Sequence, residues 1–426
     1  MFLKTVIADG IEEKKQIFDM KQRAADTGAD IDRKVAAMLE DIRLRGIDAV
    51  NEYAERFDGK KPYVISPARL EEAYAACDAA VIQALTAAAA NIREYHEKMM
   101  VRTWEYQRAP GANLGQIVRG LNRVGIYVPG GTAAYPSSVL MNAIPAKVAG
   151  VNQLVMVTPP TENLSDAVLA AAKIAGVDQV IAVGGVQAIG ALTYGAGFIE
   201  KVDKIVGPGN AFVATAKKQV FGKVDIDMIA GPSEVLVIAD RSANPAYIAA
   251  DLLSQAEHDP LASAVLLTDS RQQAENISRE MEAQAKRLSR YSVICESVRH
   301  YGCAVVFDDL KDACALANEV APEHLEIVTE NPRQYLPYIK NAGAVFLGAY
   351  APEPLGDYMA GPSHVLPTSG TARFFSPLST DAFLKKMSVI EYSQEELSRV
   401  SGQIIALAES EKLTAHANSI KVRFPK

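Results

Sequence analysis

Two Glu-His pairs are the residues of this chain whose types could most readily move protons or hold a metal ion. One pair lies in SQAEHDP, residues 254–260, and the other in APEHLE, residues 321–326, of a chain with only six histidines. An imidazole can accept a proton near neutral pH or bind a metal ion, and a carboxylate can do either through its oxygens. The elements around each pair decide which role is open to it.

The first pair is predicted to lie at the end of a helix. Asn244 is typical of an N-cap and Pro245 of a first helical position, and apolar residues then recur at helical spacing. At about 100° per residue, Gln255 and His258 lie on the same edge of this helix, whereas Glu257 projects from the other side. Gln255 and His258 could thus bind one ion together. A solvated helix end, with His258 near the last carbonyls, explains the same residues without a ligand.

The second pair is predicted to lie in a turn between a helix and a strand. A helical pattern stops at Pro322, and residues 325–328 alternate like a strand, so Glu323 and His324 fall between the two. Catalytic groups often lie in such turns on a rigid scaffold, where a histidine can accept a proton. A solvated surface connector is the alternative.

Composition restricts the class of protein. The chain has 426 residues, 49% of them hydrophobic, and a net charge of -7, so we expect two or three globular domains. Without a basic cluster, a nucleic-acid partner is not expected. No apolar run approaches the roughly 18 residues of a membrane span, and the acidic start is untypical of a secretory signal. We therefore expect a cytoplasmic protein without a membrane partner.

The four cysteines are scattered and form no C-x-x-C motif. They are Cys77, Cys295, Cys303 and Cys314. This spacing favours reduced, mostly buried thiols over a disulfide framework or a cysteine-rich zinc site.

The order of elements predicts an α/β protein. Short β-rich runs alternate with helical runs in two passages, residues 117–240 and 264–348, which indicates two parallel sheets with helices on both faces. Residues 1 to about 115 and the last fifty residues are predicted to be helical. Ligands of such sheets bind at the carboxyl ends of strands, where the glycine-rich turns VPGGT (128–132), VGGVQA (183–188) and GPGN (207–210) are expected.

The GPGN turn is the one segment with a possible dinucleotide-binding pattern. It follows a predicted strand and precedes a predicted helix, but Phe212 occupies the position where the dinucleotide fingerprint has its third glycine. A generic glycine-rich turn explains the segment equally well.

Blocks across nearly the whole chain resemble the histidinol dehydrogenase family, in the order in which that family has them. The blocks are RVGIYVPGGTAAYPSSVLMNAIPAKVAGV, VGGVQAIGALTYG, KVDKIVGPGNAFVATAKKQV, DMIAGPSEVLVIAD, DLLSQAEHDP, ANEVAPEHLEI, LGDYMAGPSHVLPT and EKLTAH. Departures from the family pattern lie mainly in the first hundred residues.

This resemblance implies an architecture and an activity. The architecture is two incomplete Rossmann-like parallel-sheet domains with helical N-terminal and C-terminal appendages. We predict an N-terminal helical segment at 1–25, a first α/β domain at 26–125 plus 236–376, a second with NAD-contacting loops at 126–235, and a C-terminal helical appendage at 377–426. The implied activity is oxidation of L-histidinol to L-histidine through histidinal, by two NAD⁺ and one zinc ion per subunit, in a homodimer with shared sites. These are the last two steps of histidine biosynthesis.

The resemblance also implies a role for each matching residue. Three residues of one chain and one of the other subunit match zinc ligands that also contact the substrate: Gln255, His258, Asp357 and, from the other subunit, His416. Glu323 and His324 match the acid–base pair. The residues that match NAD-contacting positions are Tyr127, Gln187 and Asn210. Those that match further substrate-binding positions are Ser233, Glu411 and His324. The pair Glu257-His258 would then supply a metal ligand, and the pair Glu323-His324 would move protons.

Three rival functions use parts of the same sequence. A relative that oxidises another small alcohol, such as a sulfonated diol, would keep the same machinery, although Glu411 favours a substrate with an imidazole N–H. An aldehyde dehydrogenase would need a nucleophilic cysteine. An inactive NAD- or metal-binding regulator would not need the filled acid–base positions.

Overall fold

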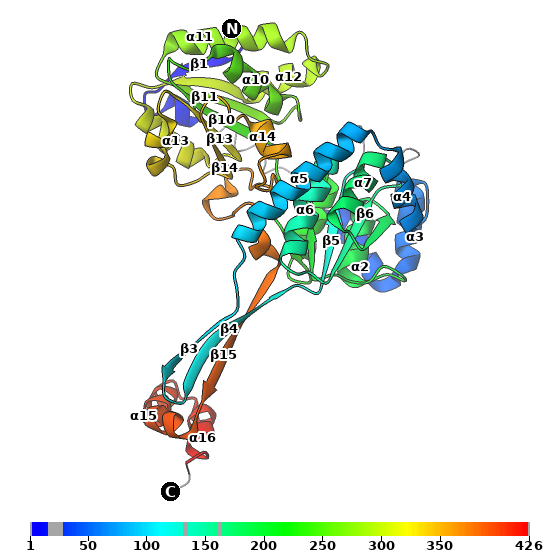
Figure 1. Ribbon diagram of the computed structural model, residues 1–426, viewed down its shortest axis with the longest axis vertical. Coiled ribbons are helices and arrows are strands. Elements are labelled where there is room, and N and C mark those ends of the chain that lie inside the picture. The colour runs from blue at the N-terminus through cyan, green and yellow to red at the C-terminus, as the bar shows by residue number, and fades with distance from the viewer. Residues whose placement is uncertain (1, 16–28, 131–134, 161–163, 425–426) are drawn as a thin grey trace. The chain divides into compact units, whose positions relative to one another are not determined.

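The computed structural model describes residues 2–15, 29–130, 135–160 and 164–424. The chain forms two compact units, residues 1–99 with 121–383 and residues 100–120 with 384–426. Among the described residues, the larger unit contains two six-stranded sheets and the smaller unit one three-stranded sheet (Figure 1). The predicted α/β class with two mainly parallel sheets is confirmed.

The first sheet of the larger unit is wholly parallel. In spatial order its strands are β1 (Lys4–Ile7), β12 (Gly302–Val306), β11 (Ser263–Thr268), β10 (Glu234–Ala239), β13 (His324–Val328) and β14 (Ala344–Leu347). One face is covered by α10 (Pro245–Ala256), α11 (Arg271–Ala285) and α12 (Tyr291–Tyr301), and the other by α13 (Leu310–Val320). Val235 and Val237 of β10 face the first group of helices, whereas Leu236 and Ile238 face α13. All residues of β10 are buried, as expected for a parallel strand covered on both faces.

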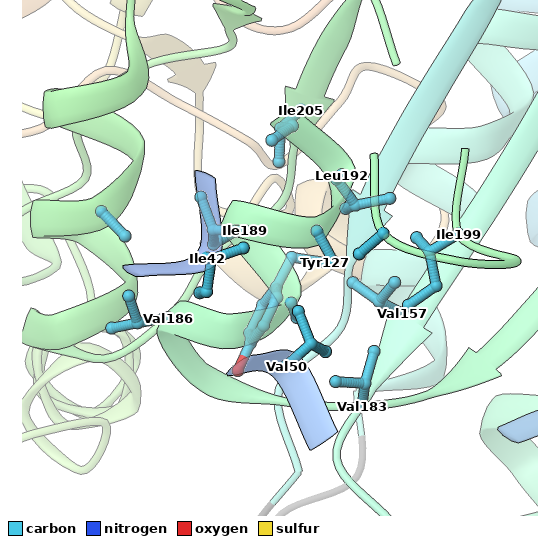
Figure 2. Close-up of a cluster of buried hydrophobic side chains, with 14 of the residues drawn as sticks. Ile42, Val50, Tyr127, Val157, Val183, Val186, Ile189, Leu192, Ile199 and Ile205 are labelled. Carbon is cyan, nitrogen blue, oxygen red and sulfur yellow. The ribbon is translucent and has the colours of Figure 1, made fainter. Parts of the chain in front are cut away.

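The second sheet is parallel except for one edge strand. In spatial order its strands are β2 (Tyr63–Ile65), β7 (Gln179–Ala182), β6 (Gln153–Thr158), β5 (Arg123–Tyr127), β8 (Lys204–Val206) and β9 (Asp225–Ile226), with β2 antiparallel to β7. One face packs against α2 (Ala29–Arg45), α3 (Ile47–Asp58), α8 (Gly185–Tyr194) and α9 (Ala211–Val220). Figure 2 shows this core, in which Ile42, Val50 and Ile189 meet Tyr127 at the end of β5. Fully burying one such aliphatic side chain stabilises a fold by about 1.5–3 kcal/mol.

The remaining helices of the larger unit lie between or beside these elements. They are α4 (Pro67–Ala76), α5 (Ala79–Lys98), α6 (Pro136–Val148), α7 (Asp166–Ala175) and the short α14 (Glu353–Tyr358). Helix α6 packs against α5 and α7. Within the described residues, no single helix has both the length and the apolarity to cross a membrane. Helices α4 and α5 meet that test only when taken together, and they are bent by 114° where they join.

The N-terminal hundred residues differ from the sequence prediction in two respects. They contain the strands β1 and β2 as well as helices, and α2, α3 and β2 pack on the second sheet, whereas the predicted division assigned residues 26–125 to the domain with 236–376. Both strands are too short and too exposed to show an alternating pattern. An apolar helical stripe also does not tell which sheet it will cover. Of the predicted helical segment 1–25, residues 1 and 16–25 lie outside the described part.

The smaller unit is an antiparallel sheet with two helices. Strand β4 (Ala112–Gly120) pairs with β3 (Trp104–Ala109) on one side and with β15 (Leu384–Tyr392) on the other. Helices α15 (Gln394–Ser410) and α16 (Thr414–Lys421) follow. Ser393 caps α15 by accepting a hydrogen bond from the N–H of Glu396 at 3.2 Å, as in a capping box. The tail therefore contains the strand β15, although it was predicted to be helical. The sequence did not indicate this strand, because β15 is largely exposed and carries no apolar alternation.

Candidate active site

A cavity of about 450 Å³ in the larger unit is lined by residues from both of its sheets. From the second sheet these residues follow the carboxyl ends of strands, as Gly207 does after β8 and Asp227 after β9. From the first sheet they lie at the amino ends, since Ser233 precedes β10 and His324 begins β13. The general expectation of ligands at carboxyl ends thus describes the second sheet and not the first.

One ring nitrogen of His324 is hydrogen-bonded to the backbone, and the other has no hydrogen-bond partner among the described residues. Its Nδ1 lies 3.1 Å from the carbonyl oxygen of Glu234. A carbonyl can only accept, so Nδ1 carries the hydrogen and Nε2 has the lone pair. Nε2 is buried and makes no hydrogen bond with any residue that the structure describes. Burial lowers the pKa of His324 to about 4, so the ring is neutral at pH 7 and Nε2 keeps its lone pair.

Glu323 is held by the same residue of β10. The N–H of Glu234 donates to Oε2 of Glu323 at 3.0 Å, and this oxygen lies 3.7 Å from Nδ1 of His324. Burial raises the pKa of Glu323 well above its usual 4.5, and the hydrogen bond from Glu234 opposes part of that rise. A carboxylate with a raised pKa is a stronger base near neutral pH. Glu323 and His324 thus form a fixed pair with two different proton-accepting groups.

Gln255 and His258 both line the cavity, because the C-terminal end of α10 lies beside it. Asn244 caps this helix through its side chain, as predicted, by accepting from the N–H of Ala246 at 3.0 Å. The helix ends at Ala256, and the N–H of His258 donates to the carbonyl of Gln255 at 3.1 Å, which extends the turn. Oε1 of Gln255 is buried and has no hydrogen-bond partner within the described part of the chain. Such an oxygen is costly to leave unpaired.

Asp357 and Glu353 bring carboxyl groups into the same cavity from α14. One ligand atom from each of His324, Glu353 and Asp357 lies within 4.8 Å of the other two, close enough to hold one metal ion. Burial raises the pKa of Glu353 to about 8 and that of Asp357 to about 6. The neighbouring carboxyl of Asp357 also contributes to the raised pKa of Glu353.

The donor types around the cavity fit a zinc ion. They are an amide oxygen, imidazoles and a carboxylate, and the unpaired Oε1 of Gln255 is an acceptor that lacks a donor or cation. The predicted ligands in the larger unit, Gln255, His258 and Asp357, all line the cavity. Asp357 also belongs to the group of three with His324 and Glu353, whose ligand atoms lie within 4.8 Å of one another. The identity of the ligands therefore stays a prediction.

Glu353 was not singled out from the sequence. Its side chain accepts from Oγ of Ser254 at 3.1 Å, and its N–H donates to Oε1 of Glu326 at 2.9 Å. These partners lie on α10 and β13, far away along the chain. A local sequence pattern cannot show such a contact, so only the fold reveals Glu353.

Two of the predicted cofactor residues lie together at the VGGVQA turn. The N–H of Gly185 donates to the hydroxyl of Tyr127 at 3.1 Å, and Nε2 of Gln187 donates to Oδ2 of Asp58 at 3.0 Å. Asp58 also accepts from the N–H of Gly184 at 2.9 Å, and this residue too was missed from the sequence. Burial raises the pKa of Tyr127 to about 12. Neither Tyr127 nor Gln187 lines the 450 Å³ cavity.

Asn210, the third predicted cofactor residue, is the N-cap of α9. Its Oδ1 accepts from the N–H groups of Phe212 and Val213, each at 3.1 Å. Phe212 is exposed, so it does not fill the helix–strand contact that the third glycine of a dinucleotide fingerprint makes. Of the other predicted turn, VPGGT, residues 131 and 132 lie outside the described part.

Glu411 and His416 belong to the smaller unit. Glu411 is the C-cap of α15 and His416 lies in the first turn of α16, and both side chains are exposed. Their predicted roles beside the substrate and the zinc ion stay predictions.

None of the four cysteines lines the cavity. Cys303 and Cys314 are buried, and burial raises the pKa of the first thiol to about 12 and of the second to about 11. Thiols with such pKa values are poor nucleophiles.

The two mainly parallel sheets and this cavity define an α/β protein in which buried histidines and carboxyl groups meet on one cavity. A sequence model of the histidinol dehydrogenase family matches residues 21–424. The chain belongs to the histidinol dehydrogenase family and is an oxidoreductase. The resemblance found in the sequence is confirmed.

Its similarity to individual members extends over the whole chain. Histidinol dehydrogenase of Clostridium acetobutylicum is 51% identical over 424 residues, which cover 98% of this chain and 98% of that protein. Histidinol dehydrogenase of Bacillus subtilis is 51% identical over 407 residues, 94% of this chain and 95% of that one. The crystal structure of histidinol dehydrogenase from Elizabethkingia anophelis has a TM-score of 0.93 at 36% identity, covering 99% of this chain and 98% of that one.

Proposed function

We propose that this chain oxidises L-histidinol to L-histidine through histidinal, with two NAD⁺ and one zinc ion per subunit, as the last two steps of histidine biosynthesis in the cytoplasm. Family membership supports the reaction. The observation that carries it is the meeting of six predicted site residues on one cavity: Ser233, Gln255, His258, Glu323, His324 and Asp357. Neither a nucleic acid nor a membrane is needed as a partner.

The metal site would be built by Gln255, His258 and Asp357, with His416 from the second subunit. Zinc, when bound, supplies a fixed positive charge that orients the amine and imidazole of the substrate. The unpaired Oε1 of Gln255 supports this assignment. Substrate binding would be completed by Ser233 and by Glu411, whose carboxylate can accept the imidazole N–H.

The first oxidation needs a group that removes the hydroxyl proton. Nε2 of His324 is buried and has no hydrogen-bond partner among the described residues, so its lone pair is available to accept that proton as the carbon loses its hydride. The hydrogen bond from Nδ1 to the carbonyl of Glu234 then stabilises the positive charge of the ring. Bound NAD⁺ supplies the hydride acceptor for both oxidations.

The second oxidation needs an activated water molecule. Glu323 can take a proton from water, whose oxygen attacks the carbonyl carbon of histidinal to form a hydrate, and the hydrate then loses a second hydride. The raised pKa of Glu323 suits this step. No thiol is required, in keeping with four cysteines that lie off the cavity. Alkylation of the thiols should therefore leave activity intact.

We propose further that the enzyme is a homodimer in which Glu411 and His416 of one chain complete the site of the other. Their exposure in the smaller unit supports this assignment. A twofold dimer would then have two equivalent shared sites.

The test of the reaction is its stoichiometry. Purified enzyme with zinc and excess NAD⁺ should form two NADH for each L-histidinol consumed, with L-histidine as the product. One NADH for each L-histidinol, with free histidinal released, would contradict the two-step proposal. Faster oxidation of a sulfonated diol than of L-histidinol would assign the chain a different substrate.

A further inference from the structure

We infer that Lys217 and Asp227 act as a positioning pair, which holds the GPGN turn, residues 207–210, in the shape that binds NAD⁺. This inference rests on the proposed function, because it assigns residues to the affinity for the cofactor. Both residues line the 450 Å³ cavity, and neither belongs to the proposed catalytic, metal or substrate residues.

The two side chains form a buried ion pair that clamps one residue of the turn. Nζ of Lys217 lies 2.5 Å from Oδ1 of Asp227, and the side chains are 4% and 2% exposed. The other carboxylate oxygen of Asp227 accepts from the N–H of Gly207 at 2.8 Å, and Nζ of Lys217 donates to the carbonyl of Gly207 at 2.8 Å. Both polar backbone groups of Gly207 are thus bound by one ion pair.

The fold explains why these two residues meet at Gly207. Lys217 lies seven residues after the N-cap Asn210, so it is on the same side of α9 two turns later and reaches back beneath the turn. Strands β8 and β9 are paired and parallel, which brings Asp227, just after β9, beside Gly207, just after β8. The N–H of Met228 also donates to Asp227, at 2.6 Å, and fixes the carboxylate further.

The backbone of Gly207 needs such support. Its φ is +106°, and a Cβ atom at this position would lie 2.1 Å from the carbonyl oxygen of Tyr127. The turn therefore presses against the end of β5, in a conformation that only glycine adopts readily. Tyr127 and Asn210, two of the predicted NAD-contacting residues, flank it. Holding Gly207 fixes the distance between them.

Stability alone does not account for the pair. Removing two charges from water is unfavourable, and well-packed apolar residues of the same volume commonly stabilise a fold as well as a buried ion pair does. The pair in this chain is instead arranged to satisfy both groups of one strained peptide at the wall of the cavity. A buried ion pair at this position is explained if it fixes the geometry of a turn that binds a ligand.

The experiment compares Lys217→Met with Lys218→Met in the intact, zinc-loaded enzyme. Lys218 is the next residue of α9 and is exposed, so it is a matched control for charge and helix propensity. Calorimetric titration with NAD⁺ should give a dissociation constant about ten-fold higher for Lys217→Met, the size expected for losing a hydrogen bond to a charged group. The affinity of Lys217→Met for L-histidinol should stay within about two-fold of wild type, and Lys218→Met should match wild type in both affinities. Lys217→Arg, which can still donate to both acceptors, should recover most of the affinity.

The double variant Lys217→Met with Asp227→Asn guards against misfolding, because it leaves no unpaired buried charge. It should show the same selective loss of NAD⁺ affinity. Unchanged NAD⁺ affinity in a folded variant, or equal losses for NAD⁺ and L-histidinol together with a lower melting temperature, would overturn the inference. Failure of the wild-type enzyme to bind NAD⁺ at all would instead contradict the proposed function.

Discussion

Nδ1 of His324 lies 3.1 Å from the carbonyl oxygen of Glu234, and this contact decides which ring nitrogen faces the cavity. The carbonyl keeps the hydrogen on Nδ1, so the lone pair of Nε2 is available to a substrate hydroxyl. A neighbouring strand, through its backbone, thus sets the protonation state of the ring. The contact persists whatever side chain stands at residue 234.

His324→Asn should therefore lower kcat for L-histidinol oxidation by at least about a hundred-fold, because it removes the proton acceptor. Single-turnover formation of NADH from L-histidinol measures this step. His300→Asn, which changes an exposed histidine of α12, is the matched control and should behave like wild type. A His324→Asn enzyme that kept more than about a tenth of the wild-type rate would show that another group takes the proton.

Glu323→Gln should impair the second oxidation more than the first. Only histidinal oxidation needs an activated water molecule, so its single-turnover rate should fall by at least about a hundred-fold while L-histidinol oxidation changes much less. The exposed Glu330→Gln serves as the control. Equal slowing of the two half-reactions would refute the separate roles of Glu323 and His324.

Metal analysis can separate the predicted ligands Gln255, His258 and Asp357 from the group of His324, Glu353 and Asp357. His258→Ala and Asp357→Ala should each lower zinc affinity by more than about ten-fold. Glu353→Gln should keep zinc, because Glu353 is not one of the proposed ligands. The opposite pattern, with zinc lost from Glu353→Gln and kept by His258→Ala, would place the ion within the His324, Glu353 and Asp357 group.

His96 should make the fold sensitive to mild acid. It is fully buried, its Nδ1 donates to the carbonyl of Ile92 at 2.8 Å, and burial lowers its pKa below the usual 6.5. Below pH 6.5 the unfolded chain takes up a proton that the folded chain resists, so the free energy of unfolding falls as the pH falls. Urea denaturation of His96→Asn and wild type, at pH 8 and pH 5 without zinc, should show a smaller loss for the variant. Identical losses would mean that His96 does not titrate differently in the two states.

Mixed dimers can test the shared site. Homodimers of His324→Asn and of His416→Asn should both be nearly inactive, one without its base and the other without a zinc ligand. In a hybrid, both changes would fall in one site and leave the other intact. With random pairing about half the dimers are hybrids, so refolding the two variants together should restore roughly a quarter of wild-type activity. If tagged hybrids form and activity does not rise, His416 serves its own chain.

Much of the fold could be predicted because its core elements carry strong local patterns. The start of α10 at Pro245 after the cap Asn244 is one case, and the alternation of buried strands and helices from β5 to β14 is another. The strand β15 was missed because most of its residues are exposed. Strand β1 was missed because four residues are too few to show a period.

In the candidate site too, local sequence patterns reveal some residues and not others. Glu323 and His324 stand out by residue type beside a predicted strand, whereas Glu353, Asp58 and the pair Lys217 and Asp227 gain their roles from partners elsewhere in the chain. A carboxylate that lies in no recognisable sequence motif is singled out only when the fold shows that it is buried. The ordered family blocks supplied roles for Tyr127, Asn210 and His416, which local patterns left without one, but they gave none to these four residues.

The position of β1 has a consequence for synthesis on the ribosome. Its only paired neighbour among the described strands is β12, at Gly302–Val306, so roughly two thirds of the chain must emerge before the first strand can find its place. The second sheet, by contrast, draws all its strands from residues 63–226. The second sheet, which carries Tyr127 and precedes Asn210, can therefore assemble while the first sheet is still being translated. Until β12 is made, β1 stays unpaired, and an unpaired strand edge can associate with other nascent chains.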